Sequence, residues 1–420
     1  MPGECCRWWL MALCLASSAV AAEADLSGHL KARVLGDSYP DNSVFRAPAG
    51  STGTTAESDL RLKMAASYGS WSIDADYQAF VIAGDNQRIA SDFLLAGDPS
   101  TLGVLDDSRR WFDLTHSIRE TNSSRLIHRL DRLSVSWTSE RTVVRFGRQA
   151  LSWGGGLFYA PMDIVNPFDP ATVDTEYKTG DDMLYAQYLR SNGDDLQLAY
   201  VGRRDLISGD FSARESTTAL KYHGIVGNSE FDVLLADNRD RNTVGLGAGV
   251  SLGGAILRAD VITADTGSGW VTEWLANLSY SWTAWGRNMT GAVEYYHNGW
   301  GLRSDGYSVA DIAADAELAQ RLARAETFTI GRNYLAAGVT IELTPLWILT
   351  PNVFANIDDP SALLQVVLQH SLGDNLTLLA AANLPMGPDG SEFGGIASVF
   401  PPDQYFSRTA GVFAQLAWYF

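Results

Sequence analysis

Hydrophobic and polar residues alternate with a period of two in many short segments of this 420-residue chain. The clearest case is SDLRLKMAASYGSWSIDADYQAFV, residues 58–81. Leu60 and Leu62 fall on one face of its first half, and Arg61 and Lys63 fall on the other. The alternation resumes after a central Gly-Ser pair. Because successive side chains of a β-strand point to opposite faces, the segment predicts a β-hairpin with one apolar face.

The same alternation predicts about 18 strands, with 16 as the alternative count. They lie near residues 26–34, 58–68, 71–82, 131–138, 141–148, 182–190, 195–202, 217–222, 230–236, 242–251, 255–263, 271–282, 288–297, 332–343, 346–355, 362–371, 375–383 and 409–420. Tight turns such as YGSW, TSER and LGDN alternate with connections of mixed length. The long connections are 35–57, 83–130, 149–181, 298–331 and 384–408.

This order of strands and connections favours a membrane barrel over a soluble β-sandwich, which is the alternative. The chain after residue 22 has no apolar run long enough to cross a bilayer as a helix, so the remaining membrane fold is a closed barrel. The predicted fold class is therefore all-β, a transmembrane antiparallel β-barrel with short periplasmic turns and long extracellular loops.

The amino terminus has the three-part pattern of a secretory signal peptide. RWWLMALCLASSAVAA places one Arg before an apolar run that ends in small residues, and the run is too short for a membrane anchor. We expect residues 1–22 to be removed and residues 23–420 to form one barrel domain. All three cysteines, Cys5, Cys6 and Cys14, lie in the leader, so no disulfide framework is expected in the exported chain.

The charge balance is acidic, with 49 acids, 31 bases and a net charge of -18. Nucleic-acid binders present basic faces, so nucleic acid is excluded as a partner.

The carboxy-terminal segment GVFAQLAWYF combines an apolar face with an aromatic end. Val412, Ala414, Leu416, Trp418 and Phe420 share that face. With this ending, the chain from Asp25 to Phe420 resembles Gram-negative outer-membrane porins. The resemblance implies an outer-membrane location, a channel for passive diffusion of small hydrophilic solutes, and contact with outer-membrane lipid and lipopolysaccharide. It also implies recognition by the barrel-assembly machinery through the terminal Phe; a homo-oligomer is left open.

If apolar positions face lipid, the alternate charged positions face the lumen. The early strands would form a mostly basic wall, and strands nine to fourteen a mostly acidic one. Such a transverse field orients dipolar or zwitterionic solutes. The candidate pore-lining set is Arg61, Lys63, Arg141, Arg145, Asp163, Asp169, Asp74, Asp76, Glu273 and Glu294.

The connection 149–181 contains three consecutive glycines, three prolines and, counted to Asp182, six acids against one Lys, so a fixed path is expected. It is either an external cap or a constriction folded into the lumen. General porins fold the loop after their fifth strand inward, and this connection also follows the fifth predicted strand. By that resemblance, Asp163 and Asp169 would face Arg61, Arg141 and Arg145.

Other candidate chemistry is weak. No Gly-x-Ser-x-Gly or His-Glu-x-x-His motif occurs, so we expect no enzyme, catalytic residue, cofactor or metal site; His116 and His128 come closest to a constellation. Asp181 and Asp182 are interpreted as solvated loop charge. Residues 308–328 show a helical stripe predicted to pack over the rim. The alternative functions are a scaffold or export barrel for a partner protein or polymer and, behind it, an outer-membrane hydrolase.

Overall fold

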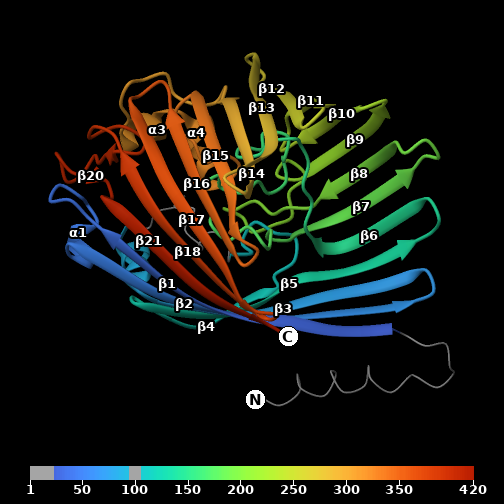
Figure 1. Ribbon diagram of the computed structural model, residues 1–420, viewed down its shortest axis with the longest axis horizontal. Helices are drawn as coiled ribbons and strands as arrows, with labels where there is room; N and C mark the ends of the chain where they lie inside the picture. Colours follow the sequence, from blue (N-terminus) through green and yellow to red (C-terminus); the bar gives the residue numbers. More distant parts are fainter. Residues whose placement is uncertain (1–22, 94–105) are drawn as a thin grey trace.

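The chain folds into a closed antiparallel β-barrel (Figure 1). The computed structural model describes residues 23–93 and 106–420, so the leader predicted at residues 1–22 lies outside the described residues. The main sheet has 19 strands, and 18 of them form the barrel wall. Strand β1 (Glu23–Ser38) pairs with both β2 (Thr52–Tyr68) and β21 (Ala410–Tyr419), and this double pairing closes the wall.

The other wall strands each pair with their neighbours in chain order. They are β3 (Trp71–Gly84), β5 (Ser124–Thr138), β6 (Thr142–Gln149), β7 (Asp181–Leu189), β8 (Asp195–Val201), β9 (Thr217–Val226), β10 (Ser229–Asn238), β11 (Asn242–Leu252), β12 (Ala255–Asp265), β13 (Trp270–Ala284), β14 (Arg287–His297), β15 (Asn333–Thr344), β16 (Trp347–Asn356), β17 (Ser361–Gly373) and β18 (Leu376–Met386). The elements outside the wall are β4 (Thr115–Thr121), β19 (Ile396–Ala397), β20 (Tyr405–Phe406), α1 (Arg46–Ala49), α2 (Asp85–Phe93), α3 (Val309–Ala314) and α4 (Ala316–Ala323).

Each of the 18 predicted strands corresponds to one wall strand, which confirms the predicted fold class. Three wall strands are much longer than predicted: β1 runs to Ser38 rather than to near 34, β2 begins at Thr52 rather than near 58, and β5 at Ser124 rather than near 131. The long-loop end of β5 pairs with β4, a short strand that the sequence pattern did not predict. These additions lie at the long-loop end of the barrel, where the wall extends beyond the ends of shorter strands such as β6.

The two faces of the wall differ as the alternation predicted. On β1, Leu26 is 68% exposed and Val34 53%, whereas His29 and Lys31 on the opposite face are 0% and 1% exposed. Aromatic side chains flank the tight turns on the outer surface, among them Tyr68, Trp71 and Trp285. An apolar outer surface with aromatic residues near one end suits a protein that sits in a lipid bilayer.

The predicted helical stripe is two helices rather than one. Asp315 interrupts it, because its side chain accepts a hydrogen bond from the backbone N–H of Leu318 and so begins α4. The stripe predicted from the sequence was Ile312, Ala316, Ala319, Leu322 and Ala323. The buried side chain of α4 is instead Leu318, and Ala316 is exposed. Within the described ranges, no helix is long and apolar enough to cross a membrane.

Candidate constriction

The connection between β6 and β7, residues 150–180, enters the barrel and is called here the lumen loop (Figure 1). Its first half reaches β14, which lies nearly opposite β6 in the wall. There the backbone N–H groups of Leu157, Phe158 and Tyr159 donate hydrogen bonds of 2.7, 3.1 and 2.7 Å to the carboxylate of Glu294. The lumen loop therefore crosses the barrel instead of capping its mouth.

Glu294 is completely buried and also accepts a 2.9 Å bond from the side-chain amide of Asn277. A second wall acid, Asp260 on β12, accepts the N–H of Gly155 at 2.7 Å. The glycine run permits this approach: Gly154 has a φ of 98°, and a Cβ at Gly156 would lie 1.7 Å from the carbonyl oxygen of Tyr159. The acidic wall thus holds the loop backbone through charge-assisted hydrogen bonds.

The second half of the lumen loop returns to the opposite wall. Asp174 accepts hydrogen bonds from Lys31 at 2.7 Å and from Arg33 at 2.9 Å, and Glu176 forms a 2.7 Å ion pair with Lys31. Burial acts to raise the pKa of Asp174, but the charges of Lys31 and Arg33 outweigh it and hold that pKa below its ordinary value. Asp174 is therefore a charged partner of the basic wall.

Tyr177 fills the space beside Asp174. The Arg61 guanidinium lies 4.4 Å from the centre of its ring, and Lys63 donates a 3.1 Å hydrogen bond to its hydroxyl oxygen. These cation–π and polar contacts attach the loop to β2. Together, Lys31, Arg33, Arg61 and Lys63 are called the basic wall.

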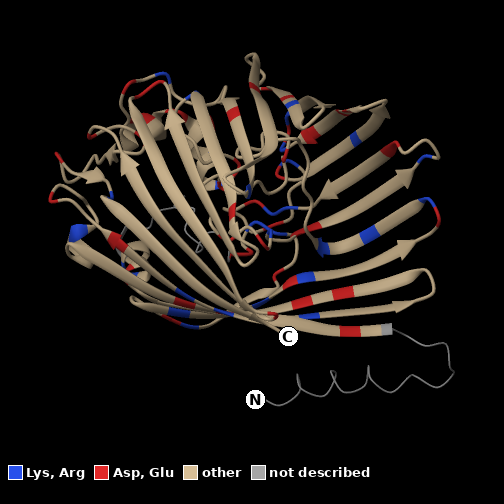
Figure 2. Ribbon diagram, viewed as in Figure 1, with Lys and Arg blue, Asp and Glu red and all other residues tan. Residues whose placement is uncertain are grey.

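A cavity of about 440 Å³ lies between the lumen loop and the strands β1, β2, β3 and β21. Its charged lining is balanced. Five bases and five acids contribute to it, namely Lys31, Arg33, Arg61, Lys178 and Arg408, and Asp37, Glu57, Asp59, Asp169 and Asp174. Figure 2 shows basic and acidic segments together on the chain inside the barrel.

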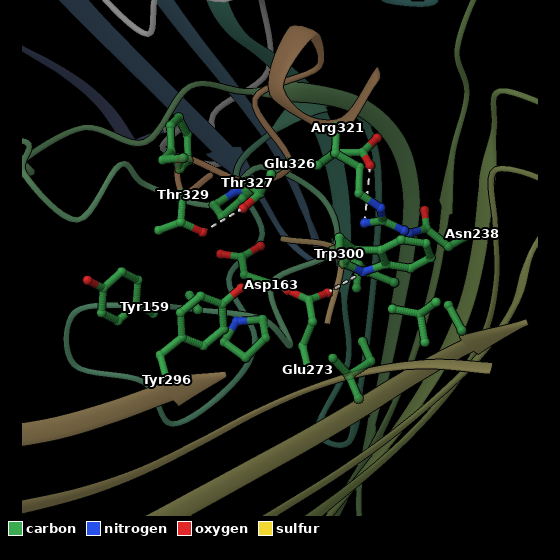
Figure 3. Close-up of a pocket in the computed structure, with 18 of the residues that line it drawn as sticks. Tyr159, Asp163, Asn238, Glu273, Tyr296, Trp300, Arg321, Glu326, Thr327 and Thr329 are labelled. Atoms are coloured by element: carbon green, nitrogen blue, oxygen red, sulfur yellow. Dashed lines mark hydrogen bonds and ion pairs between the residues drawn. The ribbon is translucent and has the colours of Figure 1, made fainter. Parts of the chain in front are cut away.

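A smaller cavity of about 50 Å³ lies on the other side of the lumen loop (Figure 3). Here the Glu273 carboxylate accepts hydrogen bonds from the Tyr296 hydroxyl at 2.6 Å and from the Trp300 indole N–H at 2.9 Å. The guanidinium carbon of Arg321 lies 3.6 Å from the centre of the Trp300 ring. The two cavities share Pro167, Phe168 and Phe328 in their linings. Apolar side chains from the lumen loop and the β14–β15 loop therefore separate the two cavities.

Two of the predicted loop acids do not face the predicted arginines. Asp163 pairs with Lys178 of its own loop, and burial raises the pKa of the Asp163 carboxyl. Asp169 lines the larger cavity and accepts the N–H of Ala171 at 2.8 Å. The acids that do meet the basic wall come later in the loop, because anchoring at Glu294 brings residues 174–177 back to β1 and β2.

The predicted bases are also divided. Arg61 and Lys63 meet the lumen loop, as described above. Arg145 donates a 2.8 Å bond to Ser136, and Arg141 is exposed in the tight turn between β5 and β6. Arg145 is bound to the neighbouring strand β5, and Arg141 is at the short-turn end of the barrel. Neither of them contacts Asp163 or Asp169.

Acids on the neighbouring strands β3 and β5 pair with the basic wall. Arg61 forms a 2.7 Å ion pair with Asp131 and a 3.4 Å one with Asp76, while the predicted Asp74 lies half-buried on β3. Asp131 was missed because a β-bulge opposite Asp76 breaks the period of two, so strict alternation does not identify which side chain of β5 points inward.

Asp181 and Asp182 are not solvated, which corrects the sequence interpretation. Both are buried; Asp181 pairs with Arg203 at 2.7 Å and Asp182 with Arg148 at 2.8 Å. Arg148 also binds Asp107 at 2.8 Å, and with these partners its charge is compensated in a nearly dry site. The two acids fix the point where the lumen loop rejoins the wall.

These features define the class of protein: a barrel of 18 strands with an apolar outer surface and an inward loop has the architecture of outer-membrane porins. A BenF-like porin from Pseudomonas fluorescens Pf-5 matches with a TM-score of 0.55 and 10% identity, over 95% of this chain and 98% of that chain. OpdK from Pseudomonas aeruginosa matches with a TM-score of 0.54 and 9% identity, over 95% and 98%. OccAB3 from Acinetobacter baumannii matches with a TM-score of 0.52 and 11% identity, over 95% and 99%. No protein-family model and no curated protein matches the sequence. At these identities the likeness concerns the fold.

Proposed function

We propose that this protein is an outer-membrane channel through which small hydrophilic solutes diffuse passively. The observation that carries the proposal is the lumen loop, which Glu294 and Asp260 anchor to one wall and which leaves a charged cavity of about 440 Å³ against the other. A lumen narrowed in this way selects solutes by size and by charge.

The proposed location and orientation follow from the outer surface and the connections. The apolar outer face fits the lipid interior, the tight turns face the periplasm and the long loops face outward. Insertion would depend on the barrel-assembly machinery, with lipopolysaccharide as the outer lipid neighbour. An association with further copies of the chain is left open.

The solute class is proposed from the lining of the larger cavity. Bases on β1 and β2 and acids such as Glu57 and Asp59 line the same space. Such a lining favours solutes that present an anionic group to the basic wall and a hydroxyl or cationic group to the acids. OccK2 from Pseudomonas aeruginosa, a barrel of similar fold with a TM-score of 0.53, has been solved in complex with glucuronate, a hydroxylated carboxylate of this kind.

Purified protein in planar lipid bilayers should produce discrete single-channel current steps. Glu294→Gln should give larger or noisier steps, because the loop loses acceptors whose charge-assisted hydrogen bonds contribute ~1.5–3 kcal/mol each. Glu342→Gln is the matched control, since Glu342 is also an acid of the later wall strands but bonds Asn288 rather than the loop. Folded, heat-modifiable protein without conductance would rule out the channel.

The scaffold or export barrel receives less support. A partner chain or polymer would need the lumen that residues 150–180 occupy, and the loop is attached to both walls through Glu294 and Lys31. Folded protein that gives no current steps, either as the wild type or as Glu294→Gln, would favour this alternative.

A further inference from the structure

A separate pocket of about 280 Å³ lies at the long-loop end of β14, β15 and β16. It is distinct from the two lumen cavities and shares no lining residue with them. Its lining is polar and largely basic, and consists of His297, Arg303, Ser304, Arg332, Asn333 and Asp358.

The pocket opens on the outer side of the barrel. His297 and Asn333 are register partners on β14 and β15, and their chain neighbours Tyr296 and Tyr334 are buried on the lumen side. Since side chains alternate along a strand, His297 and Asn333 point outward. The pocket is therefore at the level where the lipid-facing surface meets the external loops.

Below the pocket, the same outward faces are apolar. Val293 on β14 is 41% exposed, Leu335 on β15 is 43% exposed and Val353 on β16 is 39% exposed. Trp274, a ring neighbour of both Tyr295 and His297, is also exposed on this side. A basic pocket directly above an apolar strip matches a ligand with a charged head and a hydrocarbon tail.

The two arginines have spare hydrogen-bonding capacity. Among the described residues, the Arg303 side chain has no hydrogen bond or ion pair, and Arg332 uses only its Nε, which donates to the carbonyl of Gly301 at 2.7 Å. The pKa of Arg332 lies below its ordinary value, first because of burial and then because of the Arg303 charge. Two guanidinium groups in one pocket, neither of them in an ion pair with a described carboxylate, favour a phosphate ligand.

The acid in the pocket is already occupied. Asp358 accepts hydrogen bonds from the backbone N–H groups of Arg332 and Asn333, each at 2.9 Å, and from the Asn333 amide at 2.7 Å. The side-chain amide oxygen Oδ1 of Asn333 then accepts from His297 Nδ1 at 2.8 Å and from the Tyr295 hydroxyl at 2.7 Å. This network fixes the proton on Nδ1, so Asp358, Asn333 and His297 satisfy one another and leave the two guanidinium groups as the donors for a ligand.

We propose that this pocket binds the phosphate group of a lipid in the outer leaflet. Arg303 and Arg332 would hold the phosphate oxygens, and the acyl chains would lie on Val293 and Leu335. The site is on the outer face, so it depends on the proposed membrane location but not on conduction through the lumen.

The test uses diphosphoryl lipid A and the same lipid after enzymatic removal of its phosphates, each titrated against the folded barrel in detergent. The wild type should bind the phosphorylated lipid at least about tenfold more tightly than the dephosphorylated one, because charge-assisted bonds are lost with the phosphates. Arg303→Gln should weaken binding severalfold, and the Arg303→Gln/Arg332→Gln pair should weaken it further. Arg287→Gln, an exposed arginine at the other end of β14, is the matched control.

Equal binding of the two lipids, or unchanged binding by the double variant, would overturn the proposal. Inorganic phosphate is the competitor. If millimolar phosphate displaces the lipid completely, the acyl chains add nothing to the affinity of the pocket for a phosphate group. The site then takes free phosphate, and the lipid assignment is wrong. Arg303 has no hydrogen-bond or ion-pair partner among residues 23–93 and 106–420, so its single variant should remain folded and keeps the test valid if the double variant does not fold. Bilayer conductance should be unchanged in Arg303→Gln, which separates this test from that of the channel.

Discussion

At the residue scale, Glu294 and Asp174 show how far the constriction can be read from the sequence. Period-two alternation placed Glu294 on the lumen face, which the structure shows as a buried inward side chain. Its role as an acceptor for three loop N–H groups depends on where the lumen loop runs, and no local pattern encodes that path. The contact between the loop and the bases of the early strands was predicted. The acids that make this contact, Asp174 and Glu176, were not predicted, because they too depend on the path of the loop.

Neutralising Asp174 and Glu176 together should shift permeation toward anions. The variant Asp174→Asn/Glu176→Gln leaves the charges of Lys31 and Arg33 without their loop partners, so the lumen gains net positive charge. The reversal potential in a salt gradient measures this preference. The shift should shrink in 1 M salt, where the screening length is ~3 Å.

Glu140→Gln is the control for that measurement, because Glu140 is exposed in the turn between β5 and β6 and makes no contact with the basic wall. Identical reversal potentials for the wild type and the double variant would show that the loop acids do not govern ion preference.

At the element scale, the wall strands were predictable and the long loops were not. A strand that separates lipid from lumen must alternate in polarity, and this requirement marks all 18 wall strands in the sequence. Beyond the bilayer the requirement ends, so β4 and the extension of β2 from Thr52 leave no such mark. The loops are held by buried polar contacts between distant segments, which sequence periodicity does not report.

One such contact joins two long loops. Glu392, in the loop before β21, is partly buried and accepts hydrogen bonds from the N–H of Ile330 at 2.9 Å, from the Asn356 amide at 2.7 Å and from the Tyr334 hydroxyl. Burial, assisted by the charge of Asp359, raises the pKa of Glu392 to about 7. Its carboxylate is thus close to its titration point at neutral pH.

The docking of these two loops should weaken as the pH rises. A carboxyl with a raised pKa binds its proton more tightly in the docked state than when released, so docking loses free energy between the ordinary pKa of about 4.5 and about 7 and is constant above. Hydrogen exchange of the Ile330 amide, corrected for the intrinsic rate, should show greater protection at pH 5.5 than at pH 8. Glu392→Gln should remove that difference, and a pH dependence that persists in this variant would assign it to another group.

At the scale of the whole molecule, barrel closure depends on the last strand. Strand β21 pairs with β18 on one side and β1 on the other, and two backbone hydrogen bonds join Phe420 and Gly28, at 2.8 and 3.1 Å. The Phe420 ring occupies the space that a Cβ at Gly28 would need. It also lies 5.0 Å from the ring of Trp418, on the outer surface. The terminal residue therefore belongs to the closing seam as well as to the lipid-facing aromatic surface.

Assembly in the outer membrane should consequently depend on Phe420. Phe420→Asp keeps the backbone bonds but places a charge among lipid-facing side chains, whereas deletion of Phe420 removes both ring and backbone bonds. We expect both variants to show lower outer-membrane levels and unfolded precursor in the periplasm, with the deletion the more severe, measured as heat-modifiable protein in isolated outer membranes. Phe400→Asp is the matched control, because Phe400 is 85% exposed in a long loop and takes no part in the seam. If Phe420→Asp assembled as well as Phe400→Asp, the side chain would have no role in recognition, and only the backbone contribution to closure would remain.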